Sequence, residues 1–156
     1  MKTKIILTSL LLMLGLMAAQ AQNSDMFEKL SNHKDVTTVY ISKSLLNMMP
    51  NLDTGGADIK SLAGKLEQLE IYNTNGNKEA NNIIRKEVEA LTKSKTYETL
   101  MKIKDGTDNV TFYAHKEKDR FKDLIMFVNE PDDCTIIRIM GNFTAEDIQK
   151  VMDSKK

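Results

Sequence analysis

The fold is decided by residues 120–141, which read RFKDLIMFVNEPDDCTIIRIMG. Two runs rich in β-branched and aromatic residues, Arg120 to Val128 and Cys134 to Gly141, flank a short polar turn that contains Pro131. Such runs on either side of a turn predict two strands of one antiparallel hairpin. The centre of the first run is almost entirely apolar. Because strand residues alternate faces, large apolar side chains are expected on both faces of this hairpin.

Two strands before this hairpin complete a predicted four-strand meander. Residues 97–104 and 109–115 have strand composition, and the second run alternates between apolar and polar residues. Asp105-Gly106 between them is a strong hairpin signal, although the polar residues 107–109 predict a loop longer than two residues. The charged residues 116–119 predict the turn that leads into the next strand.

Helices and two more strands are expected around the meander. Apolar side chains at three- and four-residue spacing predict the clearest helix at residues 77–93. Thr144 and Asp147 predict a capping box at the start of a C-terminal helix. The other expected elements are helices at 25–34, between the cap Ser42 and Pro50, and at 58–65, and strands at 36–41 and 66–72. We therefore expect an α+β fold, a mainly antiparallel sheet with a C-terminal four-strand meander and with helices packed on one face.

The hairpin turns predict which side chains share a face of the meander. We assume that His115 pairs near Arg120 and that Asn129 pairs near Asp133. The helix-covered core face then consists of Val110, Phe112, Ala114, Phe121, Ile125, Phe127, Thr135, Ile137 and Ile139. The opposite face consists of Leu124, Met126, Val128, Cys134, Ile136, Arg138 and Met140, with Thr111, Tyr113 and His115 at its edge. A slip of one residue in either hairpin would exchange members of the two faces.

A second apolar face needs a cover, because the solvent face of an antiparallel sheet is normally polar. The cover is either the N-terminal half of the same chain or an apolar ligand, a partner protein or a second copy. The candidate binding residues on this face are Tyr113, Leu124, Met126, Ile136, Arg138 and Met140.

The N-terminus has the pattern of a cleavable secretory signal peptide over residues 1–21. Lys2 and Lys4 precede an apolar stretch at residues 5–17, and Ala19 and Ala21 supply the small residues that a signal peptidase reads. A membrane anchor or a buried helix is the alternative, but spanning a bilayer takes about 20 apolar residues. The apolar stretch is not followed by a cysteine, so a lipoprotein is not expected. We expect cleavage between Ala21 and Gln22, and a single domain at residues 22–156.

The charge balance and the cysteine content limit which kinds of partner and covalent bond we expect. The chain has 22 basic and 22 acidic residues, and without Lys2 and Lys4 the 20 remaining basic residues give a net charge of −2. A nucleic-acid partner would require a basic excess, so none is expected, nor is an integral membrane segment after cleavage. Cys134 is the only cysteine, which excludes an intramolecular disulfide, and its strand context favours a role as a small core residue.

No motif for catalysis, metal binding or cofactor binding is present in the sequence. His33 and His115 are far apart in the chain, and neither is linked to Cys134 by a motif. Asp132 and Asp133 follow a proline and are typical of a plain turn. We therefore expect no cofactor, no metal and no catalytic residue, and we regard an enzyme as the less favoured class.

Five blocks of the sequence carry a family resemblance. They are FEKLS at 27–31, VTTVYISK at 36–43, YETLMKI at 97–103, NVTFY at 109–113 and IMGNF at 139–143. In combination the chain resembles a family of exported proteins from Bacteroidetes-type bacteria that is catalogued as a domain of unknown function, family 4252. The resemblance spans nearly all of the chain after the signal peptide. It implies an exported protein and a bacterial host group, and it implies no catalytic residues.

The leading hypothesis is an exported, non-enzymatic envelope protein, periplasmic or secreted and soluble after cleavage. It would bind a protein partner or an apolar ligand through the second apolar face. One alternative is an envelope hydrolase that uses paired carboxylates among Glu67, Glu70, Asp132 and Asp133, which would need to share one cleft. Another is a structural homo-oligomer that buries the same face against itself.

Overall fold

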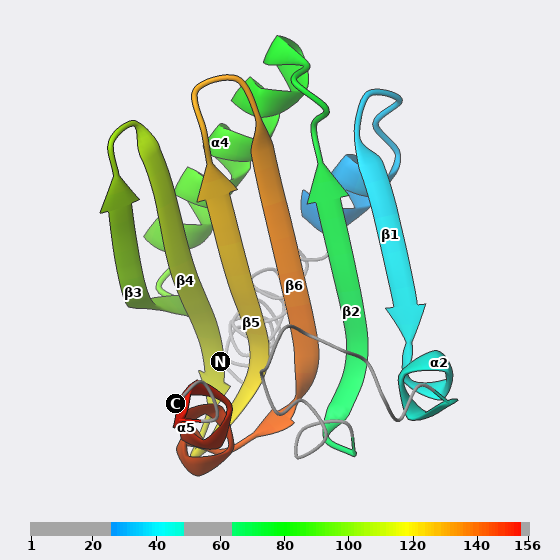
Figure 1. Ribbon diagram of the computed structural model, residues 1–156, viewed down its shortest axis with the longest axis vertical. Coiled ribbons are helices and arrows are strands. Elements are labelled where there is room, and N and C mark those ends of the chain that lie inside the picture. The colour runs from blue at the N-terminus through cyan, green and yellow to red at the C-terminus, as the bar shows by residue number, and fades with distance from the viewer. Residues whose placement is uncertain (1–25, 49–63, 154–156) are drawn as a thin grey trace, which may run out of the picture.

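The computed structural model describes residues 26–48 and 64–153, which form one sheet and its flanking helices (Figure 1). The strands are β1 (Thr37–Ser42), β2 (Leu66–Asn73), β3 (Tyr97–Asp105), β4 (Asp108–Glu117), β5 (Arg120–Asn129) and β6 (Cys134–Phe143). All neighbours are antiparallel and their order is β1-β2-β6-β5-β4-β3. The expected mixed fold with an antiparallel sheet is confirmed, and the last strand β6 joins the β3–β5 meander to the β1–β2 pair.

The helix α4 (Lys78–Lys93) and the helical residues 26–31 lie on one side of the sheet, behind it in Figure 1. The side chain of Asn77 caps α4 by accepting a hydrogen bond of 2.9 Å from the backbone N–H of Ala80. The apolar stripe of α4 is buried, as its periodicity predicts, and consists of Ala80, Ile84, Val88 and Leu91. It packs in one core with Met26, Phe27, Leu30, Tyr72, Tyr97, Tyr113, Ile125, Phe127, Cys134 and Ile136. We call this side of the sheet the covered face.

The register of the meander differs from the expected one. His115 pairs with Asp123, and Asn129 pairs with Cys134. The bulge at His115/Lys116 shifts the β4–β5 ladder by one residue, and the turn at residues 130–133 sets the β5–β6 ladder one residue away from the expected pairing. The expected division into faces is therefore wrong. Ile125 and Phe127 join Ile136 and Arg138 on the covered face, whereas Val110, Phe112, Ala114, Thr135, Ile137 and Ile139 belong to the opposite face.

The expectation that all helices pack on one face is also wrong. Leu46 of α2 (Lys43–Met48) and Ile148 of α5 (Ala145–Asp153) belong to a second, smaller core together with Phe121 and Phe143. This cluster includes Ala114, Leu124 and Ile139, so it lies on the face opposite α4. The two short helices thus close one end of that face.

Both expected helix caps are present. The hydroxyl of Ser42 accepts a hydrogen bond from the N–H of Leu45 at 3.4 Å. At the start of α5, the N–H of Thr144 donates to the Asp147 carboxylate at 2.8 Å, and the N–H of Asp147 donates to the Thr144 hydroxyl at 3.2 Å. Lys65 also forms an ion pair with Asp147, which ties α5 to the residue before β2.

Most predicted elements match the structure within a few residues, with one correction. Asp105 pairs with Asp108, so the β3–β4 loop has two residues, shorter than expected, and Gly106 adopts a positive φ of 59° there. The predicted signal peptide with its cleavage residues Ala19 and Ala21 lies outside the described residues. So do Pro50 and most of the helix expected at 58–65.

Candidate functional site

The sheet face opposite α4, which we call the open face, carries a continuous row of apolar side chains. The register places Val39 opposite Ile71, Ile71 opposite Ile137, and Ile137 opposite Met126. Met126 in turn faces Phe112, which faces Met101 on the edge strand β3. Directly opposite residues in an antiparallel sheet point to the same face. The apolar row of Val39, Ile71, Ile137, Met126, Phe112 and Met101 therefore crosses all six strands.

The rows on either side of the apolar row have different surroundings. On one side are Ile41, Leu69, Ile139, Leu124 and Ala114, next to the cluster that α2 and α5 close. On the other side are Thr37, Asn73, Thr135, Val128, Val110 and Ile103, so the polar residues gather at the β1–β2 corner. Val39, Met101 and Ile103 are 41 %, 44 % and 47 % exposed. A face of this composition is unusual where one side of an antiparallel sheet meets solvent.

The six candidate binding residues of the sequence analysis do not lie together. Leu124 and Met126 are on the open face. Tyr113 and Ile136 are core residues of the covered face, and Arg138 and Met140 lie on that same face. The prediction of an apolar second face is retained, but the structure changes its membership.

Sequence reasoning missed most of the apolar row. The assumed register predicts Ile137 and Phe112 on the helix-covered core face, whereas the observed pairing places both on the open face. The sequence places Val39, Ile71 and Met101 on no particular face, because nothing local indicates that β1 and β2 extend the meander through β6 or that β3 bulges before Met101. The alternation of Val39 and Ile41 in β1, and of Leu69 and Ile71 in β2, was the available signal.

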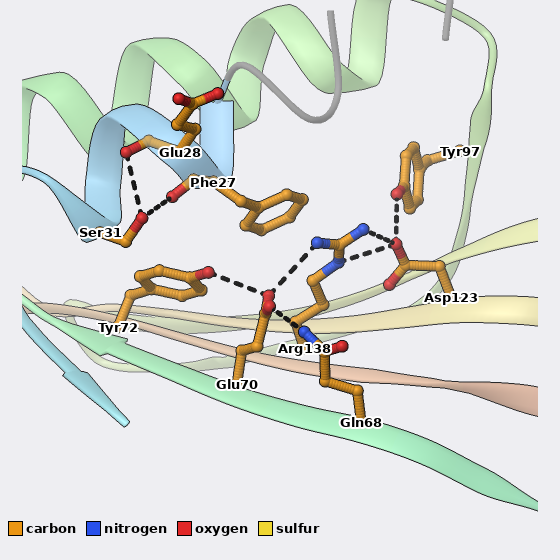
Figure 2. Close-up of polar contacts among 9 residues, drawn as sticks. All are labelled: Phe27, Glu28, Ser31, Gln68, Glu70, Tyr72, Tyr97, Asp123 and Arg138. Atoms are coloured by element: carbon orange, nitrogen blue, oxygen red, sulfur yellow. Dashed lines mark hydrogen bonds and ion pairs between the residues drawn. The ribbon is translucent and has the colours of Figure 1, made fainter. Parts of the chain in front are cut away.

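The covered face contains a buried cluster of charges centred on Arg138 (Figure 2). The Arg138 guanidinium donates to Asp123 Oδ2 from Nε at 2.8 Å and from Nη2 at 2.7 Å. Its Nη1 donates to Glu70 Oε2 at 3.2 Å. The hydroxyls of Tyr72 and Tyr97 donate to Glu70 and Asp123 at 2.9 and 2.8 Å, and Gln68 donates to Glu70 as well. Buried charges require such partners, and here each carboxylate is paired.

The aromatic ring of Phe27 covers the guanidinium of Arg138, with 3.8 Å between the guanidinium carbon and the ring centroid. This cation–π contact fastens the helical residues 26–31 to the centre of the sheet. Burial, followed by the charge of Asp123, raises the pKa of Tyr97 far above its ordinary value. Burial and Glu70 do the same for the pKa of Tyr72. Both tyrosines therefore stay protonated and serve as hydrogen-bond donors to the carboxylates.

One atom of this cluster has no hydrogen-bond partner. Asp123 Oδ1 is buried and accepts no hydrogen bond from the part of the chain that the structure describes, while Oδ2 accepts three. Arg138 lies against Oδ2, and the ring of Phe27 lies over Arg138. Each carboxylate of the cluster is held by Arg138 and by a tyrosine hydroxyl, which makes the cluster a set of mutually paired groups.

The four carboxylates considered for a hydrolase are not brought together. Glu70 is paired with Arg138 in the middle of β2, whereas Asp133 lies in the turn before β6. There it accepts hydrogen bonds from the side chains of Asn73 and Thr74. Although burial acts in the opposite direction, these hydrogen bonds hold the pKa of Asp133 below its ordinary value. Glu67 and Asp132 are exposed and do not join either group.

Cys134 is buried in the main core. Burial raises the pKa of its thiol, so the reactive thiolate is disfavoured. Among residues 26–48 and 64–153, no group of three or more His, Cys, Asp or Glu side chains is arranged to hold a metal ion. None of the described helices is long and apolar enough to cross a membrane.

Comparison with known proteins identifies one family. The model of a family described as a domain of unknown function (DUF4252) matches residues 27–151 of the chain. No curated protein and no solved structure matches.

Proposed function

The chain belongs to the DUF4252 family, and for this member we propose a non-catalytic binding role in the cell envelope. It presents the open face of its sheet to a partner protein. The observation that carries the proposal is the apolar row that runs from Val39 to Met101 across six strands. Broad apolar patches of this kind are typical of interaction surfaces.

A protein surface fits the open face better than a small apolar ligand does. Ligand sites are concave and combine apolar walls with a few polar groups that orient the molecule. The apolar row is spread along the width of a sheet, and its six members offer no polar anchor. The exposed members Val39 and Met101 lie at opposite margins of the sheet, so a partner must be broad enough to reach both.

Export is part of the proposal and rests on the sequence of residues 1–21. Their basic start, apolar stretch and Ala19-Gln20-Ala21 site support secretion to the periplasm or beyond. An apolar interaction surface in that compartment would engage another envelope or secreted protein.

The test uses two adjacent positions of β3 that lie on opposite faces. Met101 pairs with Phe112 of the apolar row, whereas Lys102 pairs with Thr111 on the covered face. The purified protein, immobilised, is exposed to envelope extract of the producing bacterium, and retained proteins and lipids are identified by mass spectrometry. The variants Met101→Glu and Lys102→Glu each introduce a glutamate carboxylate at an exposed position of the same strand.

We expect wild type and Lys102→Glu to retain one specific protein in proportion to the amount of bait. Met101→Glu should not retain that protein. Retention of lipid alone would contradict it and favour an apolar ligand. Retention of further copies of the same chain alone, lost with Met101→Glu, would favour a structural homo-oligomer that buries the open face. A protein retained equally by all three baits would show that the open face does not bind it.

A further inference from the structure

The two margins of the sheet are built differently. β3, at one margin, carries Glu98, Lys102, Lys104 and Asp105, and its ladder is interrupted by a bulge between Thr99 and Met101. Charges and bulges on an edge strand are the usual devices that prevent pairing with another chain. β1, at the other margin, reads TTVYIS and contains no charged residue and no proline. Its ladder with β2 runs from Thr37 to Ser42 without a shift.

β1 is also exposed along most of its length. Its first four residues are exposed, with Tyr40 at 60 % and Val39 at 41 %. In Figure 1 it forms the margin of the sheet, and no described strand lies beyond it. One side of its backbone therefore offers N–H and C=O groups to a further strand.

We propose that β1 pairs antiparallel with β1 of a second copy, which joins two six-stranded sheets into one. A strand without charge meets no repulsion from its own copy, and antiparallel pairing about a two-fold axis uses the same residues from both chains. β1 has no charged side chain that could form an ion pair with a charged peptide. Its composition therefore favours β1 of a second copy as the strand that pairs with it. This inference concerns the edge of the sheet and is independent of the partner proposed for the open face.

The faces of the sheet restrict the register of this pairing. Directly opposite residues share a face, so the two-fold axis must lie midway between the two copies of one β1 residue, which then pairs with itself. With the axis at Tyr40, the two Tyr40 rings stand opposite each other on the covered face. Val39 of one copy then stands opposite Ile41 of the other on the open face. An aromatic pair and two aliphatic pairs result, and the apolar rows of the two copies lie on the same side of the joined sheet.

The experiment measures the association of the purified protein by sedimentation velocity over a wide concentration range. We expect a reversible dimer, and Tyr40→Lys should raise its dissociation constant about tenfold or more, because two ammonium groups then face each other. The control Met101→Lys places the same charge on the opposite margin and on the open face, and should leave the constant unchanged. Circular dichroism verifies that each variant keeps its fold.

A second measurement determines the register from the formation of a covalent bond rather than from weakened association. Tyr40→Cys places two thiols opposite each other at the axis, so mild oxidation should yield a disulfide-linked dimer, whereas Met101→Cys should not. Cys134 is 1 % exposed and stays out of the reaction. A protein that is monomeric at all concentrations would overturn the inference. So would a dimer that tolerates Tyr40→Lys and dissociates with Met101→Lys, since that dimer would use the open face.

Discussion

Ile136 and Ile137 are neighbours on β6, and their side chains point to opposite faces of the sheet. Ile136 is completely buried in the core beneath α4, whereas Ile137 is only partly buried in the middle of the apolar row of the open face. Two adjacent residues of the same type thus have different surroundings. They provide a direct comparison between the folding core and the proposed binding surface.

Replacement of each isoleucine by alanine should separate stability from binding. Ile136→Ala creates a cavity in a closed core and is expected to lower the free energy of unfolding by about 2–5 kcal/mol. Ile137→Ala removes a partly exposed side chain and should cost less than about 1.5 kcal/mol. Urea unfolding of the two variants measures both values. Equal losses would mean that the open face is as tightly packed as the core, which would contradict its assignment.

The Arg138 cluster should behave as a unit. Arg138→Met leaves Glu70 and Asp123 buried without their cation, and we expect a loss of about 3–5 kcal/mol in the free energy of unfolding. The control is the neutral triple variant Glu70→Gln, Asp123→Asn, Arg138→Met, which removes the charges together. It should lose much less than Arg138→Met alone, because no unpaired charge remains. If the triple variant is the less stable of the two, the charges themselves stabilise the fold and the expectation is wrong.

Stability at alkaline pH should depend on Tyr97. Burial and Asp123 raise the pKa of its hydroxyl in the folded protein above the ordinary 10.0, so the unfolded chain releases this proton first. The free energy of unfolding should therefore fall as the pH rises above about 10, by up to about 1.4 kcal/mol per pH unit for this group. Tyr97→Phe should reduce that slope. Denaturation series at increasing alkaline pH measure it, and parallel curves for wild type and variant would refute the expectation.

The elements of this fold could be predicted from sequence because their signals are local. The periodicity of α4, the Ser42 and Thr144 caps, and the composition of the six strands each act within a few residues. The register could not be predicted, since neither the bulge beside Lys116 nor the exact length of the β5–β6 turn leaves a clear mark in the sequence. In the β5–β6 hairpin, the pairing of Asn129 with Cys134 rather than Asp133 was enough to exchange Ile136 and Ile137 between the two faces.

The buried charges did carry a signal that sequence reasoning did not use. Glu70, Asp123 and Arg138 interrupt strands that are otherwise largely apolar. An ionisable residue in the middle of a buried strand requires a partner of opposite charge, and two acids with one arginine suggest a shared cluster. Their proximity still depends on the insertion of β6 between β2 and β5, which is a property of the topology.

We propose that a partner protein covers the open face in the cell, and site-specific photo-crosslinking tests this most directly. A photoreactive benzoyl-phenylalanine replaces Met101, which faces the apolar row, or the adjacent Lys102, which faces away from it. Irradiation of intact producing cells should yield one discrete adduct of higher mass at position 101 and none at position 102. Equal labelling at both positions, or no protein adduct at position 101, would contradict the account.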